Sequence, residues 1–95
     1  MEGQKVVITT EWRGVFFGEL ESHDEATRIV KLRDVRMCVS WDVSRRGVLG
    51  LASHGPSAQC RISHATPAGT FYGVTAVLPA SREAVEKWET APWSG

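Results

Sequence analysis

The sequence predicts an α+β fold, in which a small, strongly twisted antiparallel sheet or partly open barrel is covered by one C-terminal helix. Short runs of β-branched and aromatic residues follow one another from residue 6 to residue 78, and turns containing glycine and proline separate them. A longer segment with helical spacing of apolar residues comes only at residues 81–90. A chain of 95 residues suits one domain with one core, so residues 1–95 are expected to form a single domain.

The first half of the chain is predicted to be mainly strand. Four runs of suitable composition lie at residues 6–10, 15–21, 27–32 and 35–41. Phe16 and Phe17 point to opposite faces of the second run, so one belongs to the core and the other needs a cover, either the C-terminal helix or another subunit. In the fourth run, Met37 and Trp41 share the face expected to be buried, because Arg36 on the opposite face is a poor choice for a dry core.

The second half combines short helices and strands. Residues 48–52 fit either one helical turn or a strand, and their leucines favour a short helix. Two more strands are predicted at residues 60–63 and 70–78. Within the second of these, Gly73 indicates a bulge or a close approach of two backbone segments. Ser81 is expected to cap the last helix, which then continues to Thr90.

The charge balance limits the classes of partner. Eleven Lys and Arg balance eleven Asp and Glu, so no overall field draws the chain to nucleic acid or to an anionic membrane. A chain without net charge is poorly protected against self-association, which favours a homo-oligomer. The N-terminus has no signal-peptide pattern, and no apolar run is long enough to span a membrane. Cys38 and Cys60 are expected to be buried thiols, with a disulfide as the alternative.

The residue patterns do not favour an enzyme. No serine or cysteine lies in a nucleophile-elbow pattern, and no Walker-type or dinucleotide-binding glycine motif is present. Cys38, His54, Cys60 and His64 have none of the paired spacings that are typical of zinc sites. We therefore expect a non-catalytic protein without a metal or another cofactor.

A local anion site is the stronger hypothesis. A small-residue loop at residues 53–58 lies between arginines, and guanidinium groups bind phosphate oxygens in pairs. The candidate ligand-binding residues are Trp12, Arg13, Arg36, Arg45, Arg46, His54, Gly55, Ser57, Arg61 and Ser63. Trp12 would stack on a base. The alternative is that these arginines are solvated and paired with acidic residues such as Glu11, Asp34 or Asp42.

The chain also resembles a family of short proteins from tailed bacteriophages and prophages that carry a domain without an assigned function. The resemblance lies in the hairpin sequence at residues 14–20, the basic strand ending in Trp41, the pair Cys60-Arg61, and the strand ending in Pro79 ahead of a helix. Val39 and Ser40 depart from it, because aromatic residues are usual there. The resemblance implies a phage origin and the cytoplasm of a bacterial host, and it implies no activity.

These observations lead to two predictions of function. The first is a phage-encoded, non-catalytic anti-defence protein that sequesters an anionic, nucleotide-type host immune signal between the arginine-bearing loop and a neighbouring subunit. The second is a protein–protein interaction module that inhibits a host enzyme or takes part in phage assembly, for which surplus aromatic residues would form the contact surface.

Overall fold

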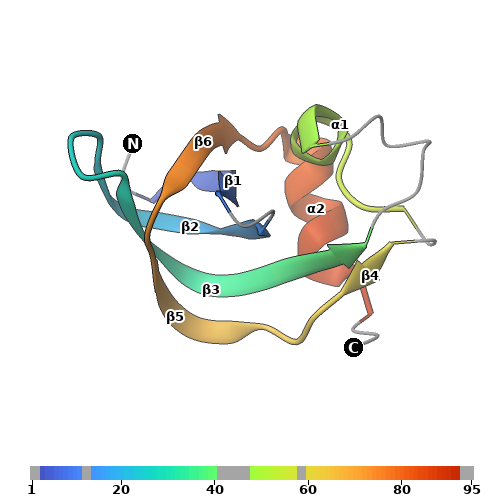
Figure 1. Cartoon of the computed structure of the whole chain (residues 1–95). Helices are drawn as coiled ribbons and strands as arrows, with labels where there is room; N and C mark the ends of the chain where they lie inside the picture. The colour runs from blue at the N-terminus through green and yellow to red at the C-terminus, as the bar shows by residue number, and fades with distance from the viewer. Residues whose placement is uncertain (1–2, 12–13, 41–47, 58–59, 93–95) are drawn as a thin grey trace.

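The computed structural model describes residues 3–11, 14–40, 48–57 and 60–92 (Figure 1). In chain order, these residues form β1 (Lys5–Thr10), β2 (Val15–Asp24), β3 (Ile29–Ser40), α1 (Val48–Ser53), β4 (Arg61–Ile62), β5 (Thr66–Phe71), β6 (Val74–Pro79) and α2 (Arg82–Thr90). None of the helices in these ranges is long and apolar enough to cross a membrane.

All of the strands pair antiparallel in one strongly bent sheet. Along its main path the order is β4-β3-β2-β1-β6, and β5 pairs with β3 on the edge that β4 also uses. β4 and β5 therefore follow one another beside β3, which Figure 1 shows clearly. In the described ranges β5 pairs with β3 and β6 pairs with β1, while β5 and β6 do not pair with each other.

The bent sheet buries apolar side chains on both of its faces. One cluster lies inside the bend and includes Val6, Ile8 and Leu32. The other lies under the helices, where Phe17 stacks on Trp88 with ring centroids 5.2 Å apart and planes 4° from parallel. Because the long strands β2 and β3 fold over the first cluster, much of the core is sheet packed on sheet.

The predicted α+β class is therefore wrong. Strands make up most of the regular structure, and two short helices, rather than one, are attached to them. The apolar spacing of α2 correctly indicated a covering helix. The α+β prediction, however, treated this one short helix as a structural layer equal in importance to the sheet. The expectation missed how far β2 and β3 extend and bend, with Asp34 at a φ of 51° inside β3.

Several element predictions are confirmed. The strands at residues 6–10 and 15–21 correspond to β1 and to the start of β2, and the short helix at residues 48–52 is α1. Ser81 is the N-cap of α2, where its hydroxyl accepts a hydrogen bond from the Ala84 amide at 3.0 Å. Cys38 and Cys60 are buried and form no disulfide.

Other element predictions are wrong. The single strand expected at residues 70–78 is divided into the end of β5 and most of β6 by a bend that contains Gly73, whose φ is 64°. Left-handed backbone suits glycine, and the close approach of two backbone segments expected at Gly73 is confirmed, because the Glu11 amide donates to the Gly73 carbonyl at 3.1 Å. The two strands expected at residues 27–32 and 35–41 are one strand through residue 40, and Trp41 lies outside the described residues.

The burial predicted for β3 is also wrong. Arg36 is only 8% exposed and Cys38 only 2%, whereas Met37 is 36% exposed and Val39 50%. The guanidinium can lie under α2 because two carbonyl oxygens accept its N–H groups. Arg36 Nε donates to the Ser63 carbonyl at 2.9 Å, and an Nη donates to the Trp88 carbonyl at 2.8 Å.

Candidate functional site

The sequence-predicted anion site is only partly within the described residues. Trp12, Arg13, Arg45 and Arg46 lie outside them. The other six fall into two groups. His54, Gly55 and Ser57 follow α1, whereas Arg36, Arg61 and Ser63 belong to β3, β4 and the segment after β4. Ligand binding by this set remains a prediction.

In the second group, Arg36 and Ser63 have structural roles. The Arg36 guanidinium links β3 to the Ser63 carbonyl and to the C-terminal end of α2, where the helix dipole favours a positive charge. Burial lowers the pKa of Arg36. The Ser63 hydroxyl accepts a hydrogen bond from the Met37 amide at 2.9 Å and donates to the His64 carbonyl at 3.0 Å. Arg61 is the exposed member of the group.

The turn after α1 is tied to the two helices. The amides of His54 and Gly55 donate to the Gly50 and Leu51 carbonyls at 2.8 and 3.1 Å, so they close the end of α1. Gly55 has a φ of 80°, and a Cβ there would lie 3.0 Å from the Ala84 Cα atom. These amides are thus engaged within the fold, in contrast to the nest of free donors that anion sites use.

Charged side chains beside this turn form a small exposed network. His54 Nδ1 lies 3.6 Å from Glu83 Oε2, and Lys87 Nζ lies 3.3 Å from the same oxygen. The hydrogen bond from Lys87 is the main cause that lowers the pKa of Glu83, and the charges of Lys87 and His54 add to it. The carboxylate thus places a negative charge beside the Lys87 ammonium and the His54 ring, where an anionic ligand would be repelled.

A shallow hollow of about 200 Å³ lies between this turn and the end of α2. It is lined by Pro56, Ser57, Lys87, Thr90, Ala91 and Pro92. Ser57 is the predicted site residue that lines it. Its amide donates to Cys60 Sγ at 3.3 Å, which holds the turn close to β4. This hollow combines hydroxyl groups and one lysine.

A second hollow was missed by the sequence reasoning. It has a volume of about 230 Å³ and lies on the inner face of β3 and β5. We call it the inner hollow, and it is lined by Phe16, Val35, Met37, Ser63, Thr66, Ala68, Gly69 and Phe71. No lining residue is charged. The available signal was the apolar alternation of Val35, Met37 and Val39, but the face that carries Met37 was expected to be buried in the core.

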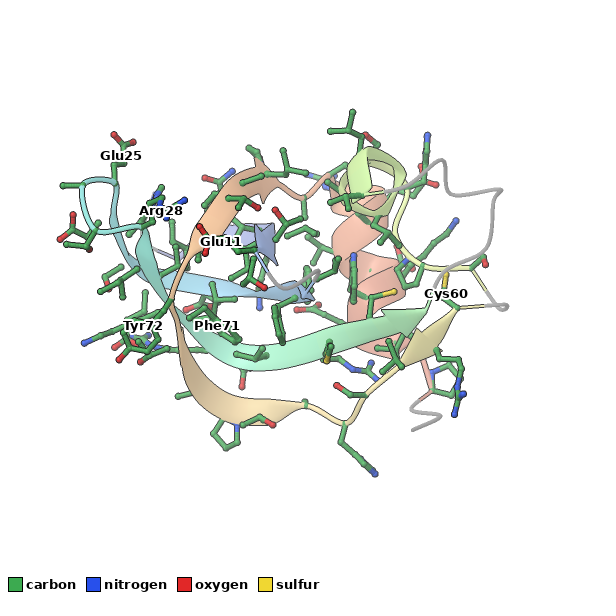
Figure 2. The ribbon with its side chains drawn as sticks, viewed as in Figure 1. Glu11, Glu25, Arg28, Cys60, Phe71 and Tyr72 are labelled. Carbon is green, nitrogen blue, oxygen red and sulfur yellow. The ribbon has the colours of Figure 1, made fainter. Side chains whose placement is uncertain are left out.

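The strands beside the inner hollow have an unusual composition. Residues 65–80 contain no charged side chain, although 23% of the chain is charged. These residues include all of β5 and β6, which are two of the three strands that pair on one edge only in the described ranges; the third is the two-residue β4. Tyr72, which is 69% exposed, stands at the turn between them (Figure 2). Natural sheets usually protect such open edges with charged residues.

The described residues contain no group of three or more His, Cys, Asp or Glu side chains that could hold a metal ion. At the end of the sheet away from the helices, Arg28 Nη2 pairs with Glu11 Oε1 at 2.8 Å (Figure 2). Both of these side chains are about half exposed. This pair joins the turn after β1 to the turn before β3.

The model of a protein family described as a domain of unknown function, DUF6948, matches residues 3–88 of the chain. The chain belongs to the DUF6948 family. This confirms the part of the sequence resemblance that concerns an unassigned domain. A search of curated proteins found no match for the chain.

Among solved structures, this DUF6948 chain is similar to a heptameric archaeal Sm protein, which was described with implications for the eukaryotic snRNP core. The TM-score is 0.55 at 15% identity, and the alignment covers 83% of this chain and 88% of the Sm protein. The likeness concerns the fold and overturns the α+β expectation. The DUF6948 chain has an Sm-like, strongly bent antiparallel sheet with attached helices.

Proposed function

We propose that this DUF6948 protein is a non-catalytic binding protein that works as a homo-oligomer. The observation that carries the proposal is the uncharged segment of residues 65–80, which supplies two open strand edges, β5 and β6, to one Sm-like sheet. An open edge presents unpaired backbone N–H and C=O groups. A second copy satisfies them at little cost when no charge has to be desolvated.

The two edges differ, so we propose a head-to-tail contact in which β5 of one copy pairs with β6 of the next. A heterologous contact of this kind produces a closed ring when its rotation closes. The similar Sm protein is heptameric, which supports an oligomer of this type.

Native mass spectrometry and light scattering after gel filtration test the assembly directly. Thr70→Glu places a charge on the exposed side of β5, while its cross-strand neighbour Lys31 helps to keep the fold. Thr90→Glu is the matched control, because Thr90 is also exposed but lies on α2. We expect the first variant to give monomers and the second to keep the oligomer. A monomeric wild-type protein at micromolar concentration would contradict the proposal.

For the ligand, we propose an anionic, nucleotide-type molecule of the host immune response, which the oligomer sequesters. The resemblance to phage proteins supports an origin in a phage and action in the bacterial cytoplasm. Exposed Arg61, together with Ser57 and Lys87 at the shallow hollow, supplies cationic and hydroxyl groups. Calorimetry with cyclic di- and trinucleotides and with ADP-ribose derivatives tests this step, and binding weaker than micromolar for all of them would contradict it.

A second candidate function is an interaction module that inhibits a host enzyme or joins a phage assembly. It is favoured by the exposed large apolar side chains of Val39, Leu49 and Tyr72. The Phe17 side chain is no part of such a surface, because it lies buried under α2. Pull-down from host lysate with wild-type protein and with Tyr72→Ala distinguishes this function, since loss of a captured protein in the variant would support it.

A further inference from the structure

The inner hollow has the shape and chemistry of a site for a flat ring. The rings of Phe16 and Phe71 meet at 4.4 Å between centroids and are tilted by 42°, so they form one aromatic wall. Val35 and Met37 of β3 add aliphatic contacts. The hydroxyl-bearing residues Ser63 and Thr66 also line the hollow, so its mainly apolar wall includes polar groups.

The size of the hollow agrees with a ring of one or two fused cycles. An apolar cavity of about 150 Å³ in a protein holds one benzene molecule. The inner hollow, at about 230 Å³, leaves room for a larger planar group. Nucleobases match this description, because they combine flat apolar faces with hydrogen-bonding edges, and aromatic side chains stack on those faces.

Gly69 keeps this space available. A Cβ at Gly69 would lie 3.0 Å from two carbon atoms of the Phe71 ring, which is tighter than ordinary van der Waals contact. A larger residue would thus push the ring or enter the hollow. Because Ala68 and Gly69 have little or no side chain, the wall of the hollow is low on the side of β5, which means that few side-chain atoms enclose the hollow there.

That low wall belongs to the strand with the open edge. Thr66, Ala68 and Gly69 all line the hollow and all lie on β5. A strand that pairs with the open edge of β5 necessarily lies beside these residues, about 4.8 Å away. The apolar side chains of β6 from the neighbouring copy would then enclose the hollow on this side.

We propose that the inner hollow is a binding site for a planar heteroaromatic ring, such as a nucleobase, and that a neighbouring copy completes it. This inference rests on the proposed homo-oligomer and nucleotide-type ligand, and it places the ring of that ligand on residues of which only Ser63 was a candidate from the sequence. The ring stacks on the Phe16–Phe71 wall, and the neighbouring β6 covers its open side.

The experiment uses adenosine as a ring without phosphate and ribose 5-phosphate as a phosphate without a ring. Calorimetry measures both, and the ¹³C-labelled methyl group of Met37 reports contact by its chemical shift, with Met1 as the other methionine signal. Met37→Lys puts a charge into the hollow. Val39→Lys is the matched control, since Val39 is an exposed residue of the same strand and does not line the hollow.

We expect adenosine to bind, to shift the Met37 methyl signal, and to lose about tenfold in affinity in Met37→Lys but less than about twofold in Val39→Lys. The monomeric Thr70→Glu variant should lose about tenfold as well. Binding of ribose 5-phosphate without adenosine would overturn the ring site and leave an anion-binding function intact.

Two other results would also overturn the inference. If neither probe binds while native mass spectrometry still shows an oligomer, the ring site is wrong and the assembly stands. If adenosine binds Thr70→Glu as tightly as wild type, the neighbouring copy does not complete the site.

Discussion

The two faces of the bent sheet bury their aromatic residues in different ways. Under the helices, Phe17 and Trp88 stack almost parallel and are both nearly inaccessible to water. On the inner face, Phe16 and Phe71 are tilted against each other and half-buried beside a hollow. Phe16 and Phe17 are neighbours in the chain, so the difference comes from what covers them. A covered face stabilises the fold, and an uncovered apolar face is available to a partner or ligand.

The largest expected effect is the loss of the helix-side aromatic pair. Trp88→Ala removes the stacking on Phe17 and the hydrogen bond that Trp88 Nε1 donates to the Leu51 carbonyl at 3.0 Å. We expect a loss of about 3–5 kcal/mol in the free energy of unfolding, measured by urea denaturation. Phe71→Ala is the comparison on the inner face and should cost clearly less. Equal losses would show that the two faces contribute alike.

The buried guanidinium is the next test of the helix-side face. Arg36→Met fills similar space but leaves the Ser63 and Trp88 carbonyls without their donor. We expect a loss of about 1–3 kcal/mol in unfolding free energy. Arg61→Met, at an exposed position, should change it by less than about 0.5 kcal/mol. If Arg36→Met leaves the free energy of unfolding unchanged, water must hydrogen-bond to the two carbonyls in place of the guanidinium.

Substituting alanine at each of three glycines compares the stability cost of one added methyl group at three places in the fold. Gly55→Ala combines a φ of 80° with atoms of Ala84 and Lys87 at 2.9–3.0 Å, and it should cost more than about 1 kcal/mol. Gly3→Ala has a similar φ of 82° with nothing within 4 Å, so it isolates the backbone strain. Gly69→Ala, on the inner face, should cost least, because the Phe71 ring can move into the hollow. Urea denaturation of all three variants measures the order.

The smallest expected effect concerns the exposed carboxylate beside His54. The pKa of Glu83 is lowered from its ordinary value of 4.5, mainly by the hydrogen bond from Lys87. Because the folded pKa is below the unfolded one, the stabilising contribution is present above the unfolded pKa and is lost as the pH falls through the folded pKa. Carboxyl NMR titration should show the Glu83 pKa rising in Lys87→Ala. An unchanged pKa would contradict the role of Lys87.

Local patterns were sufficient to predict the elements that short-range chemistry determines. The β-branched run of β1, the N-cap Ser81 and the apolar spacing of α2 all depend on residues close together in the chain. The same patterns did not predict the bend at Gly73 that divides β5 from β6, since a glycine inside an apolar run suits either a continuous strand or an interrupted one. Composition alone could not choose between them.

The site was harder to predict because burial on β3 depends on distant residues. Arg36 can be buried only because the Ser63 and Trp88 carbonyls, 27 and 52 positions away, accept its donors. Once Arg36 faces α2, Met37 faces the opposite side, and the inner hollow follows. Periodicity identifies two faces of a strand, but it does not say which one a later helix will cover.

The pairing of β1 with β6 also constrains how the chain can fold during synthesis. β1 leaves the ribosome well before its partner β6, because β2, β3, α1, β4 and β5 lie between them in the chain. Until then the outer edge of β1 is exposed, and α2, which covers Phe17, has not yet been made. Completion of the fold is therefore a late, long-range event, and a truncated translation product would present bare strand edges to quality-control proteases.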